Sequence, residues 1–180
     1  MPTPGIAESP VNASSRASTP TEPSRVDSST IWRELGKASF AVISHVSATG
    51  EPRSSGIVYG AADRKLYIVV SPDSWKARQI ATGQEVAVTV PIPRGGILAL
   101  LWPIPPATIS FAAIASVHAP GSVDLGSTSP DLVKLLPPGN ESTGCVIELT
   151  PEGSFVTYGI GVPLMGMRDA ARARARVPVS

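Results

Sequence analysis

The stretch Lys65–Pro91, KLYIVVSPDSWKARQIATGQEVAVTVP, decides the fold class of this chain. Its first part, Leu66–Val70, is a compact apolar run rich in β-branched and aromatic side chains, and this composition predicts a buried strand. Ser, Pro and Asp at 71–73 end that strand, because proline cannot donate to a sheet ladder. A short helix follows, and Val86–Val90 then predicts a second strand. The stretch therefore indicates a strand–helix–strand unit.

The junction between the first strand and the helix is a candidate phosphate site. Ser71, Ser74 and Lys76 lie near backbone N–H groups that have no helical partner, at the positive end of the helix macrodipole. Asp73 or Ser74 is expected to cap the helix. Such a junction suits a phosphate group. Most junctions of this kind bind nothing, so the spacing alone leaves both interpretations open.

The N-terminal half predicts a helix and two more strands before this stretch. Ser29–Lys37 has helical spacing and a serine cap. Phe40–Val46 and Arg53–Tyr59 flank a turn at 48–50, which predicts an antiparallel pair, and a second turn is expected at 61–64. We expect a mainly β protein, an antiparallel barrel with about six or seven strands and two or three short helices.

The C-terminal half predicts three further features. A helix is expected over Ser129–Leu136, where leucines recur at helical spacing. Cys145–Leu149 and Phe155–Tyr158 read as a hairpin about the turn residues Pro, Glu and Gly at 151–153. The segment Arg168–Arg176 is expected to be a solvated helix or tail, and nucleic-acid binding by its arginines is the minority interpretation.

A long segment, Gly95–Val123, contains no Asp, Glu, Lys or Arg. Prolines at 103, 105 and 106 would cost a spanning helix its hydrogen bonds, so a membrane helix is disfavoured. Two segments, Ile97–Trp102 and Thr108–Val117, split by a rigid turn fit better. We expect no membrane partner and a cytoplasmic location, and the uncovered apolar surface predicts a homodimer.

The composition narrows the remaining classes of function. A net charge of +1 at pH 7 argues against nucleic acid as a partner. The single Cys145 excludes an intrachain disulfide framework, and His45 and His118 lie in separate predicted strands, so no metal site is expected. Residues 1–28 are rich in Pro, Ser, Thr and Ala and are expected to form a disordered tail, which leaves residues 29–180 as one domain.

The order of these motifs resembles a known family. The Gly-Glu-Pro-Arg turn at 50–53, a strand after it, and the pattern Ser-x-x-Ser-x-Lys-x-Arg-x-Ile at 71–80 are similar to the pyridoxamine 5′-phosphate oxidase-like flavoproteins over about residues 31–92. The resemblance implies a split β-barrel that binds FMN, or in some branches a deazaflavin, at a dimer interface. It implies that the cofactor is bound by Arg53, Ser54, Ser55, Gly56, Ser71, Ser74, Trp75 and Lys76, with Trp102 reaching in from the second chain.

Two positions depart from the family pattern. Ser54 and Ser55 stand where the family commonly has an arginine that reaches the flavin phosphate. Arg53 is one residue away, a shift that sends a strand side chain to the opposite face. Trp75 stands where a basic residue is usual, so Lys76 is expected to carry most of the charge on the phosphate.

The sequence shows no catalytic constellation of side-chain acid, base and nucleophile. This is compatible with a flavin enzyme, because the cofactor carries the electron chemistry. We expect an FMN-dependent oxidoreductase that acts on a small-molecule redox substrate. The alternatives are a deazaflavin-dependent reductase and a non-catalytic dimer that binds flavin or haem.

Overall fold

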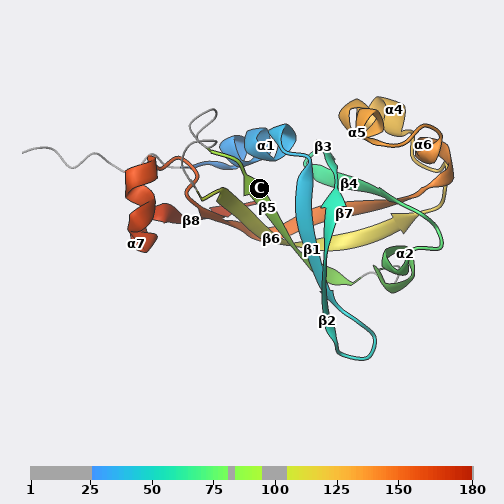
Figure 1. Ribbon diagram of the computed structural model, residues 1–180, viewed down its shortest axis with the longest axis horizontal. Helices are drawn as coiled ribbons and strands as arrows, with labels where there is room; N and C mark the ends of the chain where they lie inside the picture. Colours follow the sequence, from blue (N-terminus) through green and yellow to red (C-terminus); the bar gives the residue numbers. More distant parts are fainter. Residues whose placement is uncertain (1–25, 81–83, 95–104, 180) are drawn as a thin grey trace, which may run out of the picture.

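The computed structural model describes residues 26–80, 84–94 and 105–179, and these residues form one curled antiparallel sheet with short helices around it (Figure 1). The sheet has eight strands in the order β2-β1-β5-β6-β7-β4-β3, and β8 pairs with β7 beside this path. The strands are β1 (Phe40–Val46), β2 (Pro52–Val58), β3 (Gly60–Ala62), β4 (Lys65–Val70), β5 (Glu85–Ile92), β6 (Ala107–His118), β7 (Cys145–Tyr158) and β8 (Arg174–Pro178). The mainly β class predicted from the sequence is confirmed.

Short helices outnumber the two or three that the sequence predicted. They are α1 (Ser28–Lys37), α2 (Trp75–Ile80), α4 (Leu125–Thr128), α5 (Pro130–Leu135), α6 (Asn140–Thr143) and α7 (Ala170–Ala173), with a 3-10 turn η1 at Leu164–Arg168. In the part of the chain that the structure describes, no helix combines the length and the apolar character needed to cross a membrane.

The core lies on the concave face of the sheet. Every second residue of β1, of β5 and of β6 as far as Ala115 points inward and is buried, as the period of two in a strand requires. Helix α1 covers one end of this core with Ile31 and Leu35, both 0% exposed. Tyr59 is also buried there, and its hydroxyl donates to the Leu35 carbonyl oxygen at 2.8 Å.

The start of α1 lies one residue before the predicted helix. Asp27, not a serine, is its N-cap, because the Asp27 carboxylate accepts a hydrogen bond from the Thr30 N–H at 2.8 Å. Hydrogen bonds from Thr30 and Ser29 lower the pKa of Asp27. Residues 26–28 therefore belong to the folded domain, whereas the rest of the predicted disordered tail, 1–25, lies outside the described residues.

The strand–helix–strand unit predicted over Lys65–Pro91 is present as β4, α2 and β5. Of the two predicted caps, Ser74 makes the bond, since its hydroxyl accepts from the Ala77 N–H at 3.2 Å. The turn predicted at 61–64 is tighter than expected. It consists of Asp63 and Arg64, both with positive φ, and it joins β3 to β4 as a hairpin.

The predicted hairpin within 145–158 is wrong. This segment is one strand of 14 residues, β7, and its two halves pair with the same partner, β6. The turn residues produce a local irregularity: Gly153 has φ +67°, and the register with β6 shifts between Ser110 and Ala112. A continuous antiparallel neighbour overrides the local turn signal, because it offers ladder hydrogen bonds on both sides of the irregularity.

The C-terminal segment is also different from the prediction. Arg168–Arg176 is neither a single helix nor a free tail, because η1 and α7 lead into β8, which pairs with β7 from Ser154↔Pro178 to Tyr158↔Arg174. Val177 of β8 is buried in the core. Burial of this side chain and the ladder with β7 fix the segment as a strand. The predicted segment Ile97–Trp102 lies outside the described residues.

Candidate functional site

Lys76 and Gly56 are the predicted site residues that the fold brings into direct contact. The Lys76 Nζ donates to the Gly56 carbonyl oxygen at 3.3 Å, so the Lys76 side chain reaches from the first turn of α2 to β2. The same ammonium group lies 5.8 Å from the centre of the Trp75 ring. Among the described residues no carboxylate pairs with Lys76, so its charge is available to an anion.

Trp75 packs on a histidine that sequence analysis did not assign to the site. The Trp75 and His45 rings stack at 5.7 Å with an interplanar angle of 22°, and His45 is 5% exposed. His45 Nε2 lies 3.2 Å from Gln79 Oε1, a carbonyl oxygen that can only accept. Nε2 therefore donates in this bond. His45 Nδ1 is buried, and it has no hydrogen-bond partner within the described part of the chain.

The two serines on β2 point to opposite faces of the sheet, as neighbours in a strand must. The Ser54 hydroxyl bonds the Ser44 hydroxyl of β1 at 2.7 Å on the convex face. The Ser55 hydroxyl is buried on the other side and has no hydrogen-bond partner among the described residues. An orphaned buried hydroxyl is a donor that a ligand can use.

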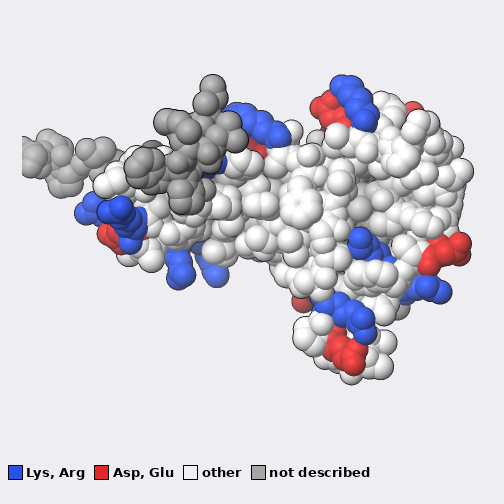
Figure 2. Space-filling view, in the orientation of Figure 1, with Lys and Arg blue, Asp and Glu red and all other residues white. Residues whose placement is uncertain are grey.

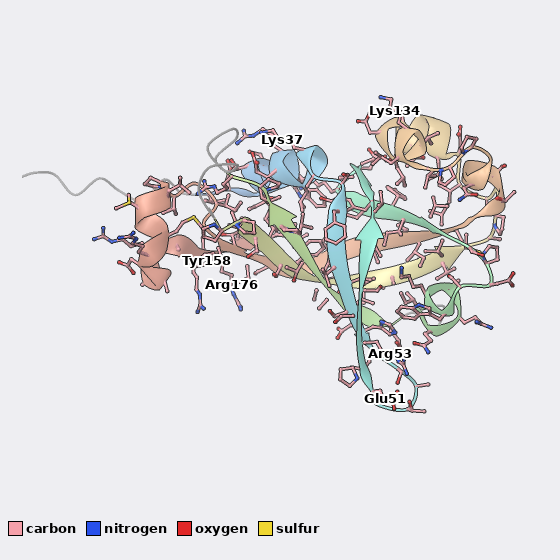
Figure 3. All side chains as sticks on the ribbon, in the orientation of Figure 1. Lys37, Glu51, Arg53, Lys134, Tyr158 and Arg176 are labelled. Atoms are coloured by element: carbon pink, nitrogen blue, oxygen red, sulfur yellow. The ribbon has the colours of Figure 1, made fainter. Side chains whose placement is uncertain are left out.

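The remaining predicted residues have other contacts, although Arg53 lines a groove together with Ser54. Arg53 donates to the Glu51 carboxylate at 2.7 Å, and both side chains lie near the tip of the β1–β2 hairpin (Figure 3). Ser71 lines a separate hollow of about 300 Å³ with Asn140 and Thr143. Ser74 has a structural role as the cap of α2. Trp102 lies outside the described residues.

A shallow groove of about 370 Å³ crosses the convex face beside Ser54. Its floor is a row of small side chains from four adjacent strands, in the register Ser54↔Ser44↔Ala87↔Ala112. Small residues on neighbouring strands leave room for a flat group. Sequence reasoning missed this groove, because no local pattern reveals which residues of distant strands stand side by side.

The electrostatics suit an anion at the edge of β2. The Lys76 ammonium has no carboxylate partner among the described residues, lies 5.8 Å from the Trp75 ring and contacts the carbonyl of Gly56, the residue that follows the orphaned Ser55 hydroxyl in β2. A phosphate accepts charge-assisted bonds from such donors. The described residues include no group of three or more His, Cys, Asp and Glu side chains that could hold a metal ion.

Comparison with known proteins supports the fold but not a particular activity. No family model and no curated protein matches the sequence. Among solved structures, a heme-binding protein from Mycobacterium smegmatis is similar with a TM-score of 0.63 and 16% identity, over 86% of this chain and 59% of that one.

Two other structures match over nearly their whole length. A putative pyridoxamine 5′-phosphate oxidase from Listeria innocua has a TM-score of 0.53 and 15% identity, over 69% of this chain and 93% of that one. An F420 reductase has a TM-score of 0.51 and 14% identity, over 68% of this chain and 93% of that one. The chain thus has the split-barrel fold of the pyridoxamine 5′-phosphate oxidase-like proteins, as the sequence resemblance predicted.

Proposed function

We propose that this protein is a flavin-dependent oxidoreductase that binds FMN and passes a hydride to or from a small-molecule substrate. The observation that carries the proposal is the Lys76 ammonium, which has no carboxylate partner among the described residues and contacts the carbonyl of Gly56, one residue after the orphaned Ser55 hydroxyl in β2. The names of two fold neighbours, a putative pyridoxamine 5′-phosphate oxidase and an F420 reductase, agree with redox chemistry on this fold.

The residues have distinct roles in this proposal. Lys76 supplies the positive charge for the flavin phosphate, and Ser55 supplies a neutral hydrogen bond. Because β2 is the last strand of the sheet, the cofactor would pass around its edge, with the phosphate at Lys76 and Ser55 and the flat ring system on the row of small residues on the convex face. The flavin, when bound, supplies the electron chemistry, so the chain needs no acid–base dyad of its own. Arg53 is not assigned to the phosphate, because Glu51 already neutralises it.

A deazaflavin-dependent reductase is the second candidate. A deazaflavin with a phosphate tail would use the same Lys76 contact, and an F420 reductase shares the fold. Haem is a third possibility, since a heme-binding protein shares the fold as well. The absorption spectrum of the purified protein separates these cofactors, because flavin, deazaflavin and haem absorb at different wavelengths.

Titration of FMN into the wild type and into Lys76→Ala tests the proposal. A charge-assisted phosphate contact contributes about 1.5–3 kcal/mol, so the variant should bind FMN about ten- to a hundredfold more weakly. Lys37→Ala is a matched control, since it also removes a helical lysine but one that pairs with Glu34 at 3.0 Å. Equal dissociation constants for all three proteins would refute the phosphate site.

We also propose that the protein is a homodimer with the cofactor between the subunits. Four large apolar side chains of the sheet are at least 40% exposed: Phe40, Val46, Val58 and Val156. Such a surface is costly in water and suits a self-complementary interface. Sedimentation with and without FMN should show a dimer that FMN strengthens, since a ligand touching both subunits favours the assembled state.

A charged variant tests this interface when it is compared with the wild type without FMN, because its position, Ala87, also lines the groove for the flavin ring. Ala87 is exposed on the convex face, so Ala87→Arg places a charge on the proposed interface without disturbing the core. We expect Ala87→Arg to be a folded monomer and Ala87→Ser to remain a dimer. A wild type that sediments as a monomer under both conditions would contradict the interface.

A further inference from the structure

The strand β8 has one open edge in the part of the chain that the structure describes. Its ladder pairs it with β7 alone. The Gly159 N–H donates to the Ala173 carbonyl oxygen at 2.7 Å, and the Val179 N–H donates to the Gly153 carbonyl oxygen at 3.2 Å. In an antiparallel strand, the backbone N–H and C=O groups of every second residue point to the same neighbour. Because Ala173 and Val179 bond to the β7 side, the odd-numbered residues of β8 face β7. The amides and carbonyls of Arg174 and Arg176 therefore point to the open edge.

Pro178, the third even-numbered residue of β8, also suits a position that faces the open edge. Pro178 has no N–H, and proline in a sheet is confined to edges where no partner needs that donor. An open edge with backbone donors is a place where another strand can add.

The same two residues carry unpaired charge. Ala175 and Val177 point inward, so the side chains of Arg174 and Arg176 project together from the convex face. Neither guanidinium has a hydrogen bond or an ion pair with any described residue, whereas the nearby Arg172 pairs with Asp169 at 3.3 Å. Figure 2 shows two basic side chains below β8 with no acidic side chain beside them, and Figure 3 shows Arg176 extending away from the sheet.

Charge decides which strand could add to this edge. A second copy of β8 would set arginine opposite arginine, and like charges at directly opposed positions destabilise a ladder. The chain itself offers no complementary strand outside the described residues, since 1–25 contains only Glu8 and Glu22 as acidic residues and 95–104 contains none. The complement must come from another molecule.

We propose that the β8 edge binds an extended acidic peptide segment of another protein, with carboxylates at alternate positions. Residues opposite Arg174 and Arg176 in the added strand have side chains on the same face of the sheet as the guanidiniums. Two acidic residues separated by one position would meet both arginines at once. Arg174 and Arg176 also give the peptide two backbone N–H donors and two carbonyl acceptors, so charge and backbone select the same register.

The test uses a fluorescein-labelled peptide, Val-Glu-Val-Glu-Val, with blocked ends, titrated with the full chain and followed by fluorescence polarisation. The double variant R174Q/R176Q should bind it about tenfold more weakly than the wild type. The matched control R33Q/K37Q removes two charges from α1 and should bind as the wild type does. A peptide with glutamine at both acidic positions should lose affinity by a similar factor.

Backbone pairing has its own readout. N-methylation of the peptide amides removes the donors and keeps the carboxylates, so binding should be lost if the peptide adds as a strand. Amide hydrogen exchange at Arg174 and Arg176 should slow when the unmodified peptide is bound. Equal binding of the methylated peptide, or equal competition by free pyrophosphate, would overturn strand addition in favour of simple charge attraction. Tighter binding of a nucleic-acid duplex than of the peptide would overturn the acidic-peptide partner.

Discussion

Replacing Tyr59 with phenylalanine measures how much one buried hydrogen bond between the sheet and α1 contributes to stability. The Tyr59 side chain is 1% exposed, and its hydroxyl donates to the Leu35 carbonyl oxygen at 2.8 Å. Phenylalanine fills nearly the same space, so the change removes one buried hydrogen bond and little packing. We expect Tyr59→Phe to lower the free energy of unfolding by about 1–1.5 kcal/mol at pH 7, measured by urea denaturation.

The pH dependence of this difference is the sharper test. Burial raises the pKa of Tyr59 above its ordinary value near 10. Because the unfolded chain releases this proton first, the stability that Tyr59 contributes is fully present below about pH 10 and is lost as the pH rises further. The loss reaches about 1.4 kcal/mol at pH 11, and the phenylalanine variant does not suffer it. The two proteins should therefore become about equally stable near pH 11.

The other tyrosines do not disturb this comparison. Burial also raises the pKa of Tyr67, but Tyr67 is present in both proteins and its contribution cancels in the difference. A difference in the free energy of unfolding between the wild type and Tyr59→Phe that stays constant from pH 7 to 11 would contradict the raised pKa of Tyr59. Equal free energies of unfolding for the two proteins at pH 7 would contradict the hydrogen bond to Leu35.

Two further predictions concern packing and the N-terminus. Gly60→Ala should lower stability by about 1–3 kcal/mol, since a Cβ at Gly60 would meet the Ser129 hydroxyl and lie 2.7 Å from Leu132 Cβ. The control Gly36→Ala should raise stability by about 0.5–1 kcal/mol, because a Cβ there meets nothing within 4 Å and Gly36 lies in α1. Thermal melts that rank the two variants in the opposite order would contradict the packing at Gly60. Deleting residues 1–25 should leave the melting temperature unchanged, whereas deleting 1–27 removes the Asp27 cap and should lower it by about 2–4 °C. A drop on the shorter deletion would mean that 1–25 packs on the domain.

The sequence predicted elements well where local pattern and tertiary environment agree. Phe40–Val46 was predicted with the bounds that the structure shows, because its apolar run is also a strand with one buried face. The prediction from sequence failed where the local pattern and the tertiary environment favour different structures. The alternation of Arg and Ala before Val177 has the period of a strand, but both residue types favour helices, and only the ladder with β7 decides between them.

Only the part of the candidate site that depends on local motifs was predicted from the sequence. Lys76 and Gly56 were both in the predicted set, and the fold joins them. The groove on the convex face was missed, because the register of four strands puts Ser44, Ala87 and Ala112 in one row, and these residues are far apart in the chain. His45 entered the sequence analysis only as a residue not expected to bind a metal, and its stacking on Trp75 and its buried, unpartnered Nδ1 depend on the tertiary fold of the described residues.

The pairing of β4 with β7 has a consequence for folding kinetics. Lys65 and Glu148, which form an ion pair across this ladder, are 83 positions apart in the chain. The entropy of closing so long a loop must be lost before any contact between the two strands can compensate for it. Barrels dominated by such distant pairings fold in about milliseconds to seconds, whereas helical bundles of similar size fold faster. We therefore expect the local β3–β4 hairpin to form early and its docking onto β7 to limit the rate of folding.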